Sequence, residues 1–173
     1  LGMLTSIFIA RQLGPDDYGA YSAIIWLVAM GVAISNAGTA SAVIKFVAEL
    51  RGSERDELIA PTVAYLRKAQ HWFMLAVIVA VGLLLLLSGQ HIATGFDHWM
   101  IFGFLAIAIG LRSQYMFNVG IAKGFEDFRV TAIVAGIATP INLAMVVLAW
   151  ILDAEVEALL AVFLISGVIF YAI

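Results

Sequence analysis

The stretch that decides the fold is YGAYSAIIWLVAMGVAISNAGTASAVI, residues 18–44, which runs for 27 positions without a charged side chain. An α-helix rises about 1.5 Å per residue, so about 20 apolar residues cross a hydrocarbon core roughly 30 Å thick. The stretch is therefore long enough to span a membrane. Charged residues border it on both sides, with Asp16 and Asp17 before it and Lys45 after it.

Five further apolar runs occupy most of the remaining chain, and Arg112 is the only Asp, Glu, Lys or Arg within them. Uninterrupted runs such as 83–87 favour helices over the alternating strands of a membrane barrel. We therefore predict one all-α, polytopic transmembrane bundle over 1–173, with about six helices. The first run covers only half a span and the last stops early, so we expect truncated end helices and a fragment of a longer protein. The expected helices are 1–12, 18–48, 60–88, 98–122, 129–152 and 156–173.

The composition excludes several functional classes. Hydrophobic residues make up 64% of the chain and charged residues 12%, against roughly 45–50% and about 25% in soluble domains. The net charge of −3 offers no electrostatic basis for binding nucleic acid. No cysteine, nucleophile elbow or phosphate-binding glycine loop is present, and His91, Asp97 and His98 fit no zinc spacing. We therefore expect no enzymatic activity, catalytic residue, metal or cofactor, and the sequence identifies no coupling ion.

The basic residues predict an orientation, because loops rich in Lys and Arg stay in the cytoplasm. The second connection holds five such residues and the fourth holds Lys123 and Arg129, whereas the first holds only Arg11 and the third holds none. We expect loops 45–68 and 123–129 to face the cytoplasm, and the first helix to run from inside to outside.

Arg112 is the clearest functional candidate. It lies 14 residues after His98, roughly 21 Å along a helix, and a guanidinium facing lipid there costs at least about 2.5–3.5 kcal/mol. It either faces a cavity, where its planar fork suits phosphate or carboxylate, or reaches the interface or a structural partner. Gln114, Tyr115 and Asn118 follow on the same helix and extend a polar stripe, which indicates either a wet cavity or ordinary interhelical bonding.

Two other expected spans contain polar interruptions. Small and polar residues surround Asn36 and Gly38 and favour close helix approach or a bend. Pro140 removes a backbone hydrogen bond beside Asn142 and predicts a kink at mid-membrane, which is a candidate hinge or a purely structural feature. We count Asn36 and Asn142 among the cavity candidates, and Gly38 and Pro140 among the hinge candidates.

Three segments resemble motifs of one transporter family. RQLGPDDYGAYS at 11–22 is similar to the R-x-L-G-P-x-x-Y-G-x-Y segment of polysaccharide biosynthesis flippases, the O-antigen and exopolysaccharide transporters of the multidrug/oligosaccharidyl-lipid/polysaccharide exporter superfamily. NAGTASAVIKFVAE at 36–49 resembles their small-residue segment ending in R/K-F-x-A-E. GIAKGFEDFR at 120–129 resembles their Q-G-x-x-R/K-F connection. Gly14, Pro15 and Gly19 belong to the first motif, where Gly14–Pro15 predicts a tight turn and marks the family rather than a substrate site.

The resemblance implies both an architecture and a function. It implies the N-terminal half-bundle of a transporter with twelve to fourteen helices and a central cavity. Such a protein flips a lipid-linked oligosaccharide, usually carried on undecaprenyl pyrophosphate, across the bacterial or archaeal cytoplasmic membrane, alongside other polysaccharide assembly proteins. Arg112 is then the candidate to attract the pyrophosphate. A multidrug exporter of the same superfamily is the first alternative, but exporters of cationic drugs need acids within their spans. A membrane-embedded saccharide polymerase or ligase is the second, and it needs a larger outer loop than this chain has.

Overall fold

The computed structural model describes residues 2–88 and 97–172, except the side chains of Val130 and Ala135. His91 and the expected helix ends at residues 1 and 173 lie outside this part of the chain. Every regular element within it is helical, which confirms the all-α prediction. The elements are α1 (Gly2–Ser35), α2 (Thr39–Gly52), the short 3-10 helix η1 (Asp56–Leu58), α3 (Ile59–Ser88), α4 (His98–Gly124), α5 (Arg129–Ile133), the π-helical segment η3 (Val134–Ala138), α6 (Thr139–Ile151) and α7 (Val156–Ala172).

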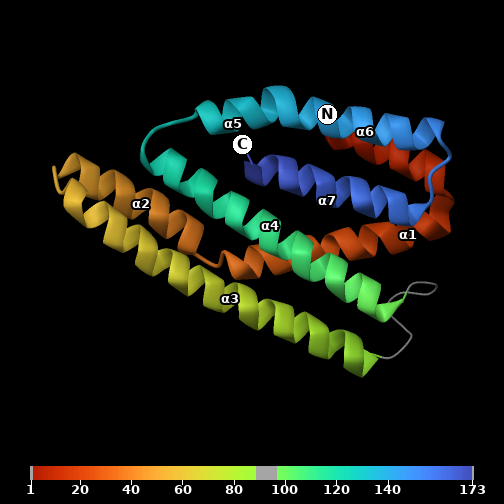
Figure 1. Cartoon of the computed structure of the whole chain (residues 1–173), viewed down its shortest axis with the longest axis horizontal. Helices are drawn as coiled ribbons and strands as arrows, with labels where there is room; N and C mark the ends of the chain where they lie inside the picture. Colours follow the sequence, from red (N-terminus) through yellow and green to blue (C-terminus); the bar gives the residue numbers. More distant parts are fainter. Residues whose placement is uncertain (1, 89–96, 173) are drawn as a thin grey trace.

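A sharp turn at Gly14 divides α1 into two helical segments, which point in nearly opposite directions in Figure 1. Gly14 has φ 72° and ψ 179°, a conformation almost restricted to glycine because it has no Cβ. Pro15 follows at the start of the second segment, where its missing N–H costs no helical hydrogen bond. Gln12 fixes this turn to another part of the chain, since its side-chain amide donates to the carbonyls of Ala149 and Ala154.

The helix expected over 18–48 does not run as a single helix, because it is interrupted at the small and polar residues that favoured close approach or a bend. The chain leaves helical geometry at Asn36, and α2 begins at Thr39 after Gly38, whose φ is 80°. The side chain of Asn36 donates back to the carbonyl of Val32 (3.0 Å), and the N–H of Thr39 donates to the carbonyl of Asn36 (2.9 Å). Such local bonds offer the backbone an alternative to the helical ladder, and glycine tolerates the positive φ.

The helices pack side by side, and their connections gather at two ends of the bundle (Figure 1). The turn at Gly14, the last turn of α3, the first turn of α4 and the connection 152–155 lie at one end, and the α2–α3 and α4–α5 connections lie at the other. Four helices within the described ranges are long and apolar enough to cross a membrane: Gly2–Ser35, Asp56–Leu87, His98–Gly124 and Thr131–Ile151. Together with the composition, they indicate a membrane protein.

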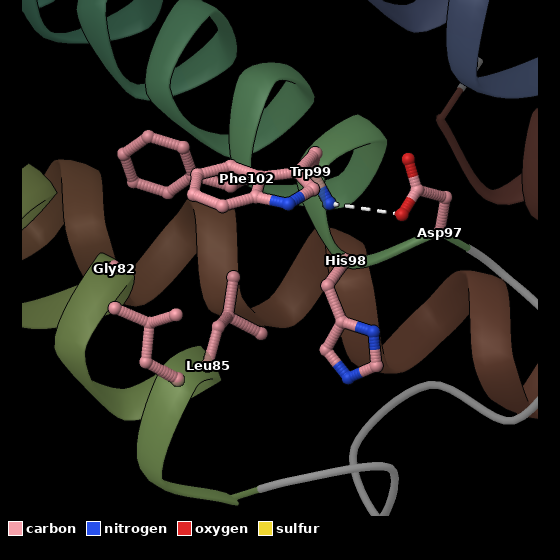
Figure 2. Close-up of a pocket in the computed structure, with 7 residues that line it drawn as sticks. Gly82, Leu85, Asp97, His98, Trp99 and Phe102 are labelled. Atoms are coloured by element: carbon pink, nitrogen blue, oxygen red, sulfur yellow. Dashed lines mark hydrogen bonds between the residues drawn. The ribbon is translucent and has the colours of Figure 1, made fainter.

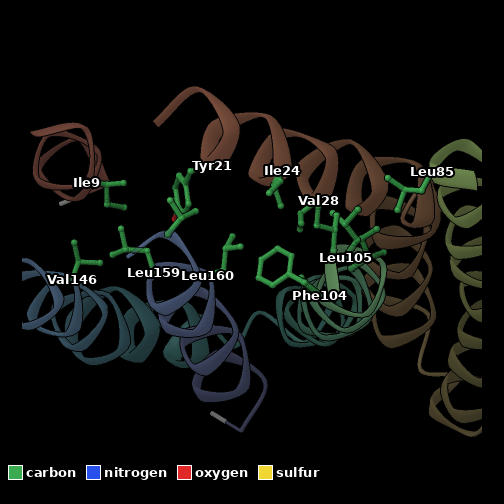
Figure 3. Close-up of a cluster of buried hydrophobic side chains, with 14 of the residues drawn as sticks. Ile9, Tyr21, Ile24, Val28, Leu85, Phe104, Leu105, Val146, Leu159 and Leu160 are labelled. Atoms are coloured by element: carbon green, nitrogen blue, oxygen red, sulfur yellow. The ribbon is translucent and has the colours of Figure 1, made fainter. Parts of the chain in front are cut away.

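Two clusters of buried apolar side chains hold the bundle together. The larger cluster joins α1, α3, α4, α6 and α7, and Figure 3 shows Ile9, Tyr21, Phe104 and Leu159 among its members. The smaller cluster joins α2, α3 and α4 around Val43, Val47, Ile59 and Phe117. Small residues let the α2 and α4 backbones approach closely, since a Cβ added at Gly120 would lie 3.1 Å from the carbonyl oxygen of Ala40.

The helix expected over 129–152 changes its winding just before Pro140. Residues Val134–Ala138 are π-helical, and α6 begins at Thr139. Pro140 has no N–H to donate to the preceding turn, and a wider turn is one way for the chain to accommodate this. The hydroxyl of Thr139 donates to the carbonyl of Val134 (3.0 Å) and so satisfies one of the acceptors in this segment. The feature beside Pro140 is therefore a local π-helical segment.

Candidate functional site

A cavity of about 410 Å³ lies between α1, α4, α6 and α7. Both segments of α1 contribute to its wall, and the turn at Gly14 is what brings them to the same space. Polar side chains of α1, α4 and α6 line it, whereas α7 supplies apolar residues. The polar members of the lining are Thr5, Ser6, Tyr18, Tyr21, Ser22, Arg112, Thr139 and Asn142.

Two aromatic rings of α7 hold the Arg112 guanidinium. Its central carbon lies 4.7 Å from the ring centroid of Phe163 and 4.7 Å from that of Phe170. The electron-rich ring faces attract the cation, and a guanidinium is weakly hydrated, so the rings stabilise the charge without neutralising it. The Nε atom is shielded from solvent and has no hydrogen-bond partner among the described residues. The two rings thus contact the guanidinium while its Nε–H keeps donor capacity for a ligand.

The electrostatics of the cavity follow from this one residue. Arg112 is the only charged side chain among the described residues that line it, and the lining contains no Asp or Glu. In a medium of low dielectric constant, an uncompensated cation favours an anionic ligand strongly. Hydroxyl groups and the Asn142 amide beside it could bind the neutral polar parts of the same ligand. The arrangement suits recognition of a phosphate or carboxylate rather than covalent catalysis.

The structure brings only some of the predicted site residues together. Arg112 and Asn142 line the same cavity. Asn118, expected to share that space, instead accepts a hydrogen bond from Arg67 (3.1 Å) on another side of α4. The reason is geometric: Asn118 lies six positions after Arg112, which rotates it about 120° around the helix. Gln114 is half-buried and does not appear in the lining.

Tyr115 and Asn36 also lie outside the cavity lining. The ring of Tyr115 packs against Phe170, with 5.7 Å between centroids. Asn36 accepts a hydrogen bond from Gln70 (3.3 Å). Tyr115 therefore contacts α7, and Asn36, in the break between α1 and α2, contacts α3.

The hinge candidates divide by backbone geometry. Gly14 and Gly38 have positive φ and mark the two breaks in the N-terminal helices. Pro15 begins the segment after the first break, and Pro140 follows the π-helical segment. Gly19 lies in regular helix, and a Cβ there would meet nothing within 4 Å.

Sequence reasoning missed Gln70 and the two phenylalanines of α7. Gln70 is 1% exposed and donates to the carbonyl of Ser113 (2.8 Å) as well as to Asn36, so it links α3, α4 and the break after α1. It is an uncharged polar residue inside an expected span, so the reasoning applied to Arg112 could have found it. Phe163 and Phe170 are seven residues apart and share a face of α7, but no local signal pairs that face with Arg112.

A second cavity, of about 400 Å³, lies between the end of α3 and the start of α4 (Figure 2). Leu85 and Phe102 form much of its apolar wall, and Asp97 caps α4 by accepting from the N–H of Trp99. It contains none of the predicted site residues. Within the described residues, no group of three or more acidic or histidine side chains could hold a metal ion. The cavity around Arg112 is therefore the best-supported candidate site.

The comparisons with known proteins add no family assignment. The chain matches no protein-family model, no curated protein and no solved structure.

Proposed function

We propose that this chain is part of a transporter that flips a lipid-linked oligosaccharide across the cytoplasmic membrane, and that Arg112 binds the diphosphate of that substrate. The observation that carries the proposal is the charge of the cavity, where Arg112 is the only charged residue described in the lining. Such a site favours an anion, whereas a carrier of cationic drugs needs acidic residues in its cavity.

The size and chemistry of the cavity support the same substrate class. A volume of about 410 Å³ falls within the range of small-molecule sites, roughly 300–1,000 Å³. It suits a diphosphate with an adjoining sugar better than a whole lipid-linked glycan. The hydroxyl and amide groups of Ser22, Thr139 and Asn142 offer hydrogen bonds to sugar hydroxyls.

The wider family features form part of the proposal. The three sequence motifs support membership of the polysaccharide flippases, with this chain as the N-terminal half-bundle of a larger transporter. The basic loops support a cytoplasmic location of 45–68 and 123–129 in a bacterial or archaeal membrane. Transport needs no covalent step, so we propose no enzymatic role for these helices. Other polysaccharide assembly proteins are the expected partners.

A complementation assay tests the role of Arg112. We expect Arg112→Ala in the full-length protein to abolish export of surface polysaccharide while its abundance in the membrane stays at the wild-type level. Lys123→Ala is a matched control, because it removes a cation from the same helix outside the cavity. Normal export by Arg112→Ala, or an equal loss with Lys123→Ala, would refute the assignment.

A further inference from the structure

We infer that a groove between α3 and the end of α4 binds an anionic phospholipid from the leaflet on the side of the basic loops. The groove has a volume of about 630 Å³. It is separate from the cavity around Arg112, with which it shares no lining residue. Its described lining consists of Arg51, Asp56, Ile59, Ala60, Val63, Ala64, Arg67, Ile121 and Phe125.

The level of the groove along the helices matches the headgroup region of a bilayer. Arg67 and Lys68 come immediately before the uncharged run that starts at Ala69, so the groove lies on the loop side of that run. Tyr65 is 74% exposed in the same part of α3, as is typical of an aromatic residue at a membrane interface. On α4, Ile121 lies within the apolar run, so the groove extends from the interface toward the hydrocarbon core.

The two arginines of the groove are held in place and retain donors for a phosphate. Arg67 donates to the Asn118 side chain (3.1 Å) and lies 5.4 Å from the ring centroid of Phe117. Arg51 donates to the carbonyl of Phe125 and lies 5.8 Å from its ring centroid. A guanidinium has five N–H groups, so these contacts leave others for an anion. With Asp56, the lining carries one net positive charge.

The walls of the groove fit the apolar part of a lipid. Ala60 and Ala64 are one helical turn apart on α3 and exposed, so a lipid acyl chain can lie close to the helix backbone there. Ile121 of α4 and Phe125, which directly follows α4, line the same groove, and Phe125 is 40% exposed. A groove with basic residues and an apolar floor at the interface is complementary to a phospholipid with a negatively charged headgroup.

Native mass spectrometry of the full-length protein, titrated with phosphatidylglycerol or phosphatidylcholine, tests this site. We expect Arg51→Gln combined with Arg67→Gln to weaken phosphatidylglycerol binding about tenfold or more, since each arginine supplies charge-assisted hydrogen bonds. Arg55→Gln is the matched control, because it removes one charge of the same loop outside the groove. We expect it to bind like the wild type.

A second variant and a competitor separate the alternatives. Ala64→Leu keeps both arginines and fills the groove at an exposed position, so we expect it to weaken phosphatidylglycerol binding even if replacement of Arg67 disturbs folding. An excess of inorganic phosphate should leave the lipid bound. The inference would be overturned if both the double variant and Ala64→Leu bound phosphatidylglycerol like the wild type, or if Arg55→Gln lost as much affinity as the double variant. It would also be overturned if the wild type showed no preference for phosphatidylglycerol over phosphatidylcholine, or if phosphate displaced the lipid.

Discussion

The close packing of α4 against α2 gives a direct test of the bundle. Gly124 is the last residue of α4, and a Cβ placed on it would lie 2.7 Å from Cβ of Val47 and 3.3 Å from the carbonyl oxygen of Ile44. Val47 is fully buried, and neither neighbouring atom is the end of a flexible side chain. Gly124→Ala therefore forces the two helices apart.

The expected cost follows from the clash. Overpacking a well-filled interface costs about 1–3 kcal/mol, and alanine recovers at most about 1 kcal/mol of helix propensity, less at a helix end. We expect a net loss of about 1–2 kcal/mol, which lowers the unfolding midpoint of a domain of this size by about 2–8 °C. Gly110 of the same helix is the control, because a Cβ there meets nothing within 4 Å.

Thermal unfolding of the purified protein in lipid nanodiscs measures both variants. We expect Gly110→Ala to unfold at or above the wild-type midpoint and Gly124→Ala to unfold below it. Equal midpoints for the two variants would refute the close approach of α2 and α4.

Three further predictions test the turn, the buried amide and the orientation. Gly14→Ala should lower stability by about 1–3 kcal/mol because the positive φ strains an L-residue, whereas Gly19→Ala should have little effect; thermal unfolding compares them. Gln70→Leu should cost about 1–3 kcal/mol by leaving buried acceptors unpaired, and a midpoint equal to the wild type would contradict the observed bonds. The chain has no cysteine, so a single introduced cysteine reports its own side of the membrane. Ser53→Cys should react with a membrane-impermeant maleimide only after the cytoplasmic side is opened, whereas Glu155→Cys should react with the same reagent added outside. The reverse pattern would invert the predicted orientation.

Most of the helical architecture could be predicted because a membrane-spanning helix is recognised from the length of an uncharged run and the charges at its borders, both of which are read along the sequence. The length and charged borders of the run 18–44 predict a span, and Gly14–Pro15 predicts a turn. The break at Asn36–Gly38 was only partly visible. Its small and polar residues indicated a bend, but the extent of the break depends on backbone bonds of Asn36 and Thr39.

The candidate site was less accessible to sequence reasoning, because it depends on which helix faces meet. The cost of a charge in a span singled out Arg112. The same reasoning could not separate Asn142, which shares its cavity, from Asn118, which bonds to Arg67 instead. Nor could it find the cation–π contacts of Arg112 with Phe163 and Phe170, since these contacts join segments far apart in the chain.

Binding of a lipid-linked oligosaccharide to the full-length protein tests the central claim most directly. Isothermal titration with an undecaprenyl pyrophosphate-linked saccharide compares the wild type with Arg112→Met and with Lys123→Met, which removes a cation of α4 outside the cavity. We expect Arg112→Met to weaken binding at least about tenfold, because a charge-assisted hydrogen bond contributes about 1.5–3 kcal/mol, and Lys123→Met to bind like the wild type. Unchanged affinity in Arg112→Met, with the protein folded, would contradict a role of Arg112 in holding the diphosphate.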